Sequence, residues 1–470
     1  MSHYLSNSFH LILISLGVIS GIVYLFSLRL EQIIGIFKSG VTGIHIFIFQ
    51  FLILSVLYFI GAYLIFKKLL SNKYTRSLII TIFLFGVLFR VILLMSTPLL
   101  SDDIYRYLWD GRVQSEGINP YLYPPSAEEL NQLRDGKIYP NINRQEFPTI
   151  YPAGAQIFFF LSHTIARDIY AFKGLLVFFD VMTMMVLVAF LRAYKLQEIR
   201  FFIYAWNPLV IYEIAGSGHL EGLTVFLVAL AFYLTAINKK TFGVIALALA
   251  SSTKLYPAIL LPVLLEKGER MKGLIIFSVC FLITYIPYLS AGINVTGFLP
   301  TYLESPYESF NLGLKYLLMH IFQGLDYHLL TKIFLGAILA ASMFFLFKEK
   351  RKELIPRYAY ILIGLFVIVT PTALHPWYIL WLIPFLAFYP SPAWLIFSCA
   401  VSLSYLKYIT PDGKMPSWVL FLEYIPLFVL LILGYIWKLS TTQSWFSIHK
   451  KLAIGVIETY VIPKKKKVID

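Results

Sequence analysis

The sequence predicts an all-α integral membrane protein, a helical bundle of about 12–14 membrane segments. Of its 470 residues, 59% are hydrophobic and only 14% are charged, which is too little charge for the surface of a soluble domain of this size. The hydrophobic residues also occur in repeated runs close to the ~20 residues that a helix needs to cross a bilayer. These two observations exclude a water-soluble class.

The membrane segments are expected where the apolar runs lie. Residues 8–27 are interpreted as the first span, because no small-residue cleavage site follows that would mark a removed signal. The other spans are placed at 44–66, 78–97, 172–191, 200–215, 220–237, 273–290, 328–347, 357–373, 376–390, 392–409 and 418–437. No internal repeat and no separate soluble domain is evident, so residues 1–470 are expected to form a single membrane domain.

One further apolar run, residues 241–265, does not fit a simple span. Basic residues flank both of its ends, and Lys254 stands in its middle. Two short helices meeting at "SSTKLYP" would keep both flanks on one side, and broken helices are tolerated where they line a cavity. We favour this re-entrant form over a single span.

The basic residues fall in short clusters between the apolar runs, as is typical of cytoplasmic loops. The formal net charge of +14 therefore indicates membrane topology rather than nucleic-acid binding. The clusters placed in the cytoplasm are 67–76, 192–200, 238–240, 348–353 and the tail 438–470, with lysines at 464–467. The extracytoplasmic side then receives the large first loop, 98–171, and the shorter segments 216–222, 291–311, 372–377 and 410–417.

The first loop is too long for a plain connection. The stretch "SDDIYRYLWDGRVQSEG" (101–117) predicts one helix, with Ser101 as its N-cap and Gly117 at its end. A second helix is expected to start in residues 126–136. Residues 147–166 are apolar but short, which is typical of a helix at the membrane interface. The loop is therefore expected to stand over the outer mouth of the bundle.

Asp102 and Asp103 at the start of that helix are the candidate catalytic carboxylates. A structural alternative exists, since Asp102, Arg106 and Asp110 stand at i, i+4 and i+8, the spacing of a salt-bridge ladder. Carboxylates in a first turn also complement the helix dipole. This alternative does not account for Asp103, which lies on another face of the helix. At a helix start on the membrane surface, below the loop, its carboxylate is well placed to accept a proton.

Ionisable residues inside the apolar segments are a second group of candidates, because each costs at least ~2.5–3.5 kcal/mol at membrane depth and usually faces a cavity or a partner. Lys254 is favoured as a phosphate ligand, with a buried pair to Asp180 or Glu213 as the structural alternative. Asp180 itself is favoured as structural. For His375, a binding role and a plain hydrogen-bonded role are equally supported.

Neither a metal nor a cofactor is predicted. Cys280 and Cys399 both lie in apolar segments, which supports neither a disulfide framework nor a cysteine metal site. Asp102 and Asp103 can supply oxygen ligands to a hard cation, but no third acidic residue is clearly nearby.

Several motifs occur in a recognisable order: "SDDIYRY" with "WDGR", "GINPY", "TIYPAGAQ", "WNPLVIYEIAGSGHLEG", "STKLYP" and "HPWYILWLIPFL". The ordered set resembles the lipid-phosphate-sugar-dependent glycosyltransferases of the C-type membrane fold (GT-C). It is most similar to the mannosyltransferase group that includes the catalytic subunit of GPI mannosyltransferase I and bacterial polyprenyl-phosphate-mannose enzymes. The resemblance covers residues 100–385 in outline, and no single motif in it is specific.

The resemblance implies roles for individual residues. The loop aspartate of the family falls on Asp102, but members often show Asp-x-Asp, so the adjacent pair leaves open whether Asp102 or Asp103 is the base. The lysine of the "K-x-YP" motif falls on Lys254, and the acidic residue of the small-residue turn falls on Glu221. The residues expected to bind the donor phosphate are Lys254, Arg106, Arg112 and His219, and those expected to bind substrate are Glu221, Tyr105, Tyr151, Tyr256 and His375.

The implied reaction is transfer of a hexose, with mannose preferred, from a polyprenyl-phosphate donor to a lipid-linked or glycan acceptor at the extracytoplasmic face. An aspartate would deprotonate the acceptor hydroxyl in an inverting displacement. Aminoarabinose, galactose, rhamnose or arabinose donors would need the same groups. The competing functions are a glycan ligase or polymerase that uses a lipid-linked oligosaccharide, and a lipid or sugar transporter.

The cellular location is inferred from weak motifs. The terminal "KKKKVID" does not place its lysines in the register of a dilysine retrieval signal, and the one outer sequon at Asn294 is near chance. A prokaryotic inner membrane is therefore preferred to the endoplasmic reticulum.

Overall fold

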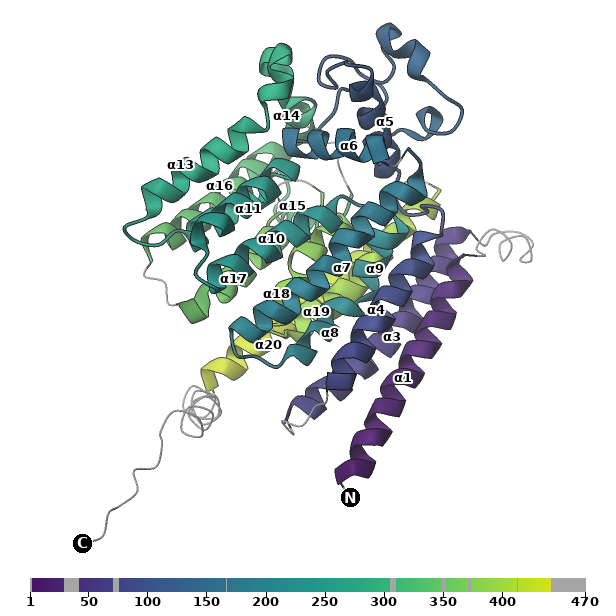
Figure 1. The fold of residues 1–470 in the computed structure, drawn as a ribbon, viewed down its shortest axis with the longest axis vertical. Coiled ribbons are helices and arrows are strands. Elements are labelled where there is room, and N and C mark those ends of the chain that lie inside the picture. The colour runs from purple at the N-terminus through teal and green to yellow at the C-terminus, as the bar shows by residue number, and fades with distance from the viewer. Residues whose placement is uncertain are drawn as a thin grey trace.

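A computed structural model describes residues 2–28, 42–70, 76–165, 167–304, 310–348, 352–370, 373–411 and 413–440. Every regular element among these residues is helical, which confirms the all-α class. The helices run side by side in a tilted bundle, with a smaller helical layer above one end of it (Figure 1). The predicted basic tail lies almost wholly outside the described residues.

Long apolar helices form the body of the bundle. Seven helical segments among the described residues are long and apolar enough to cross a membrane: Phe9–Ser27 in α1 (Ser2–Ser27), Gly43–Lys67 in α3 (Gly43–Leu70), α4 (Arg76–Leu94), α7 (Ile169–Ala193), α16 (Tyr327–Phe347), Pro392–Ile409 and Ser417–Ile436 in α20 (Ser417–Ser440). The segment Pro392–Ile409 consists of α19 (Pro392–Ala400) and η9 (Val401–Ile409). An eighth is a pair bent by 92°, α13 (Arg270–Ile283) with Ile286–Tyr302. A multi-pass membrane protein follows.

The remaining predicted spans are present as shorter or interrupted helices. They are η3 (Glu198–Phe201), α8 (Phe202–Ala205), α9 (Pro208–Ile211), α10 (Glu221–Ala236), α17 (Ile355–Ile368), η8 (Pro376–Trp381) and α18 (Ile383–Leu386). Proline interrupts several of them, because it cannot donate the backbone hydrogen bond that a helix interior needs. Residues 201–225 are buried throughout, so neighbouring helices shield this irregular backbone from lipid.

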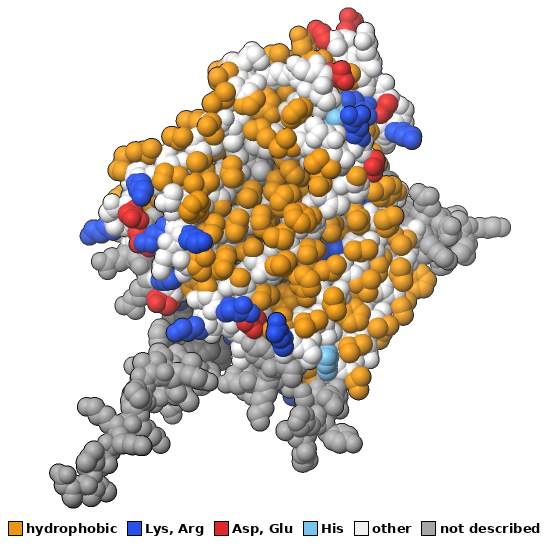
Figure 2. Space-filling view, viewed as in Figure 1, with side chains coloured by type: hydrophobic (Ala, Val, Ile, Leu, Met, Phe, Trp, Pro, Cys, Tyr) orange, Lys and Arg blue, Asp and Glu red, His pale blue; other side chains and the backbone are white. Residues whose placement is uncertain are grey.

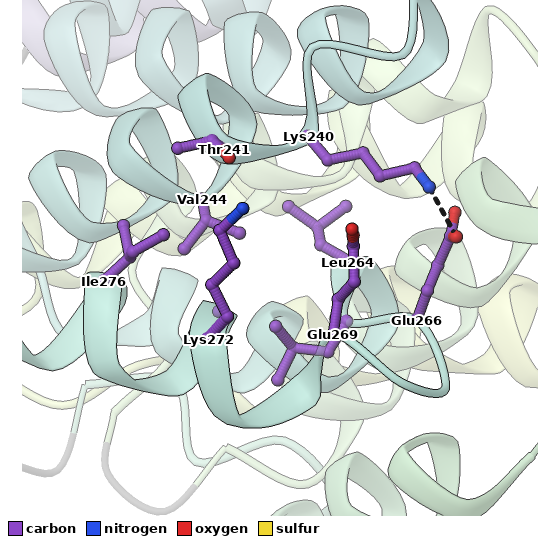
Figure 3. Close-up of a pocket in the computed structure, with 10 residues that line it drawn as sticks. Lys240, Thr241, Val244, Leu264, Glu266, Glu269, Lys272 and Ile276 are labelled. Carbon is purple, nitrogen blue, oxygen red and sulfur yellow. Dashed lines mark hydrogen bonds and ion pairs between the residues drawn. The ribbon is translucent and has the colours of Figure 1, made fainter.

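The run 241–265 is a broken element whose two ends return to the same place. It contains α11 (Lys240–Thr253), η5 (Tyr256–Leu260) and α12 (Leu261–Leu264). The Nζ atom of Lys240 lies 2.6 Å from Oε2 of Glu266, so the two flanks are joined by an ion pair, as the re-entrant form requires (Figure 3). An open hollow beside this pair is also lined by Thr241, Glu269 and Lys272.

The first loop forms the layer over one end of the bundle, which we call the loop end. The loop contains α5 (Asp103–Ser115), η1 (Glu128–Leu133), η2 (Tyr139–Asn141) and α6 (Ala153–Ile165). Further short elements lie in the later segment 286–321, namely η6 (Ile286–Thr296), α14 (Leu299–Glu304) and α15 (Leu314–Ile321). The loop helices α5 and α6 and the helix α14 gather at the top of the view, while α1 begins at the bottom. Hydrophobic side chains cover most of the flank between the two ends of the bundle, and most charged side chains lie at those ends (Figure 2).

The helices of the loop differ in detail from those predicted. The predicted helix 101–117 is α5, whose N-cap is Asp102 rather than Ser101; the Ser101 hydroxyl accepts a hydrogen bond from the backbone of Asp103 (3.3 Å). The predicted end at Gly117 is confirmed, since Gly117 has a φ of 76°. The second predicted helix is only a short 3₁₀ turn, η1, whereas the predicted interfacial helix is α6.

Candidate active site

The two candidate aspartates open α5 at the loop end and share one hydrogen-bond donor. The amide nitrogen of Asn143 donates to Oδ1 of Asp102 (2.7 Å) and to Oδ1 of Asp103 (3.0 Å). Asp102 is exposed, whereas the Asp103 side chain is only 20% exposed. The second oxygen of Asp103 is turned toward the bundle, which distinguishes the two carboxylates.

His219 is the residue that Asp103 faces. The Nδ1 atom of His219 lies 3.8 Å from Oδ2 of Asp103, and its Nε2 atom lies 3.2 Å from Oε2 of Glu213. Both His219 and Glu213 are fully buried. The hydroxyl of Tyr405 donates to the other Glu213 oxygen (2.7 Å). His219 therefore lies between two carboxylates, one at the edge of the site and one in the interior.

The local backbone explains this placement. Asn207 caps α9 with its side chain, and Pro208 occupies the first helical position, where no backbone donor is needed. The helix then widens into a π-helix, η4 (Tyr212–Gly216), which carries Glu213. The backbone N–H of His219 donates to the carbonyl oxygen of Glu213 (3.0 Å), so the turn after η4 folds back on it. Such π-turns are frequent at functional sites.

Lys254 forms a pair that the sequence alternatives did not include. Its Nζ atom lies 2.5 Å from Oε1 of Glu221, in the first turn of α10. The Lys254 side chain is 14% exposed and that of Glu221 is fully buried. Asp180 is instead paired with Arg90 (2.6 Å) inside the bundle, in keeping with the structural role expected for it. Lys254 is thus bound neither to Asp180 nor to Glu213.

The two arginines of α5 lie in other pairs. Arg106 is buried and pairs with Asp110 (2.8 Å), which is the second half of the expected ladder, and it donates to the carbonyl oxygen of Phe147 (3.0 Å). Arg112 pairs with Asp135 (2.7 Å) across the loop. The structure therefore places His219 beside Asp103 and Lys254 beside Glu221, whereas Arg112 is paired within the loop.

Stacked rings support the polar groups from the bundle side. His219 stacks on Trp377 (4.0 Å between ring centres), which stacks on His375 (4.4 Å), and His375 stacks on Phe310 (4.8 Å). These contacts restrict rotation of the His219 ring. His375 is part of this stack, and its Nδ1 has no hydrogen-bond partner within the described part of the chain.

Two candidate tyrosines pack against other aromatic rings. Tyr151 forms an edge contact with Tyr107 (5.0 Å), and Tyr256 stacks on Trp381 (3.6 Å). Tyr105 is partly exposed on the first turn of α5. Burial raises the pKa of the Tyr107 and Tyr151 hydroxyls, and the charge of Asp103 raises it further, with a smaller contribution from Glu221. The charges of Asp103 and Glu221 therefore both act on these two hydroxyls.

Asp102 has an altered acidity. Although Asp102 keeps contact with solvent, the protein around it displaces part of its hydration, and this desolvation raises the pKa of its carboxyl, as does the neighbouring charge of Asp103. Hydrogen bonding from Asn143 acts in the opposite direction. Two adjacent carboxylates on one amide donor thus have different chemical surroundings.

Sequence reasoning assigns no role to Asn143 or Trp377, and it treats Glu213 only as a structural partner for Lys254. A signal for Glu213 exists nonetheless, because a carboxylate in an apolar run is itself a reason to expect function. Asn143 lies in a polar loop where its composition carries no such information. Among the described residues, no group of three or more His, Cys, Asp or Glu side chains is arranged to hold a metal ion.

Comparison with known proteins gives two matches. A family model described as "Alpha-(1->6)-mannopyranosyltransferase, N-terminal domain" matches residues 9–266, more than half of the chain. The curated Alpha-(1->6)-mannopyranosyltransferase A of Corynebacterium glutamicum is 26% identical over 172 residues, which are 36% of this chain. That match spans only 35% of the length of the relative. The region matched by the family model contains Asp103, His219 and Lys254.

Proposed function

The chain belongs to the alpha-(1->6)-mannopyranosyltransferase family, and on this premise we propose that it transfers mannose from a polyprenyl-phosphate-linked donor to a lipid-linked or glycan acceptor. The reaction takes place at the loop end, on the extracytoplasmic side of a bacterial inner membrane. The observation that carries the proposal is the position of Asp103. Its carboxylate is at the edge of the bundle, one-fifth exposed, and faces a fully buried histidine.

Asp103 is the general base in this proposal. A carboxylate that removes a proton from an acceptor hydroxyl must be reachable by that hydroxyl and held in place. Asn143 holds one oxygen of Asp103, and the helix start fixes the backbone, while the other oxygen is free to turn between the acceptor and His219. Asp102 is exposed and does not face the buried histidine. Its role in the site is to accept the second hydrogen bond from the Asn143 amide.

Lys254 stabilises the leaving phosphate. Phosphate on a sugar is a good leaving group that needs no protonation, so the main requirement is a cation near the departing oxygens. The lysine is partly exposed and is presently neutralised by Glu221. The donor phosphate competes with Glu221 for the ammonium group of Lys254. Glu221 then keeps the lysine side chain oriented toward the phosphate.

The stereochemistry follows from a single displacement. The acceptor oxygen attacks the anomeric carbon, its proton passes to Asp103, and the bond from that carbon to the phosphate oxygen breaks. Configuration is inverted, so an α-linked product requires a β-linked mannosyl phosphate. The polyprenyl chain of the donor remains among lipids along the apolar flank of the bundle, which explains why the catalytic groups stand directly above membrane helices.

The test is a transfer assay with a defined donor. Purified protein in bilayers receives β-linked polyprenyl-phosphate mannose carrying a labelled sugar, together with a lipid extract from a bacterial membrane. The proposal expects labelled mannose in an α-linked product, and none with Asp103→Asn protein of unchanged thermal stability. Transfer only from a nucleotide sugar, or equal transfer by Asp103→Asn, would overturn it.

A further inference from the structure

Three groups inside the protein form a line that begins at Asp103. Its Oδ2 atom faces Nδ1 of His219 at 3.8 Å, and Nε2 of His219 faces Glu213 at 3.2 Å. Neither nitrogen of His219 nor the facing oxygen of Glu213 has a conventional hydrogen-bond partner among the described residues, although all are buried. Buried polar atoms that lack such partners call for an explanation.

The fold holds this line in place from three sides. The π-helix η4 carries Glu213, and Tyr405 fixes the second oxygen of Glu213 with a hydrogen bond of 2.7 Å. Gly218, with a φ of 78°, makes the turn that brings His219 against α5; a Cβ there would lie 2.5 Å from the Ile104 side chain. The stack on Trp377 fixes the plane of the imidazole ring.

We infer that Asp103, His219 and Glu213 form a proton relay, in which Glu213 is a positioning residue for His219. This inference rests on the proposed function, since it takes Asp103 as the group that receives the acceptor proton. An ionised Glu213 favours the tautomer that carries its proton on Nε2, because the negative carboxylate oxygen lies 3.2 Å from that nitrogen. Nδ1 then faces Asp103 as a proton acceptor.

The relay keeps Asp103 able to accept a proton during each turnover. The acceptor hydroxyl loses its proton to Asp103 as its oxygen bonds to the anomeric carbon, and Asp103 passes the proton to Nδ1 of His219. The resulting imidazolium is flanked by carboxylates, and the phosphate departs with its bonding electrons. After the product leaves, the proton returns through Asp103 to solvent, so no net charge remains. The same logic of an oriented histidine operates in hydrolase triads.

The test reads the His219 tautomer without requiring turnover. Protein labelled with ¹⁵N-histidine is reconstituted in bilayers, and the His219 signals are identified among the nine histidines by their loss in His219→Gln. The expected result at neutral pH is a protonated Nε2 and a bare Nδ1. Glu213→Gln should give a mixture of tautomers. Asp180→Asn is the matched control, since it also removes a fully buried carboxylate but lies in the pair with Arg90.

Mannosyl transfer is measured on the same samples. Glu213→Gln should lower kcat about 10- to 100-fold with little change in the donor KM, because proton transfer and not donor binding is affected. Asp180→Asn should change stability without this selective loss in kcat.

The outcomes separate the two proposals. An unchanged tautomer in Glu213→Gln overturns the relay, whatever the activity. A changed tautomer in a protein whose wild type transfers no mannose from any polyprenyl-phosphate donor leaves the Glu213–His219 contact established and overturns the proposed function and the proton transfer built on it. A changed tautomer with unchanged kcat assigns Glu213 a purely structural role and also overturns the relay.

Discussion

Lys254 and Glu221 lie 33 residues apart in the chain, and their side chains meet at 2.5 Å at the loop end of the bundle. The glutamate is fully buried and the lysine is not. In a low-dielectric site, removing one member of such a pair leaves an uncompensated charge. Replacing Lys254 and replacing Glu221 should therefore have different effects on mannosyl transfer.

Replacing Lys254 should disable transfer. Lys254→Gln removes the cation that we assign to the leaving phosphate, so kcat/KM for the donor should fall at least ~100-fold, the scale seen when one electrostatic donor is removed from an active site. The measurement is donor saturation kinetics in bilayers. Lys240→Gln is the control, because it breaks the Lys240–Glu266 pair, which is a third or more exposed and lies where the two flanks of 241–265 meet. Equal loss in both variants would contradict the assignment.

Replacing Glu221 should weaken donor binding less than replacing Lys254 does. Glu221→Gln keeps a hydrogen-bond acceptor near Lys254 but removes the competing charge, so the donor KM should not rise. Transfer should fall modestly, by less than about 10-fold, since the lysine is less well oriented. A loss as large as that of Lys254→Gln would show that Glu221 acts directly on the substrate.

The two aspartates are expected to separate in a matched pair of substitutions. Asp103→Asn should lower kcat by about 10²–10⁴-fold, the usual contribution of a general base. Asp102→Asn should lower it far less, because Asp102 does not face His219. Single-turnover assays on proteins of equal thermal stability make the comparison. The reversed order of effects would assign the base to Asp102, the position on which the family aspartate falls.

Much of the fold follows from composition, because the membrane fixes the length and polarity of a spanning helix. The long helices α1, α3, α4, α7, α16 and α20 lie where apolar runs predict them. The buried, broken segments 198–216 and 376–386 are different, since their backbone is shielded by other helices and hydropathy does not limit it. Here local breaks such as η4 depend on tertiary packing.

The sequence names the residues of the candidate site but not their pairings. Lys254 stands out as a charge in an apolar run, where burial is costly, while His219 and Glu221 are named through the family resemblance. Which partner each one meets depends on how α5, α10 and the turn after α11 come together. Asn143 illustrates the limit, since only the folded loop brings it to Asp102 and Asp103.

Acid should remove one of the bonds that hold the loop. Burial alone would raise the pKa of Asp135, but hydrogen bonds from the Ile138 backbone and from Arg112 lower it from 3.8 to about 2. A carboxyl whose folded pKa is depressed stabilises the fold above its unfolded pKa, and this stabilisation is lost as the pH falls through the folded pKa. Asp135→Asn should therefore lower the thermal midpoint at pH 7, and the difference from wild type should shrink between pH 4 and pH 2. A difference that is constant over this range would contradict the role of the charge.

Gly218 offers a test of how the turn after η4 places His219. Gly218→Ala strains a backbone with a φ of 78° and drives a methyl group against the Ile104 side chain at 2.5 Å. Because Ile104 is fully buried and has little room to rotate away, we expect the turn and α5 to move apart, which increases the distance between His219 and Asp103. We expect kcat to fall at least ~10-fold, beyond any loss of stability.

Gly292→Ala is the matched control: Gly292 also has a positive φ, 54°, but a Cβ added there would meet no atom of the described residues within 4 Å. Both variants carry the same kind of backbone strain, and the added contact with Ile104 should lower the thermal midpoint of Gly218→Ala further. Only Gly218→Ala should lose turnover, and equal activity in the two variants would show that the exact approach of His219 to α5 is unimportant.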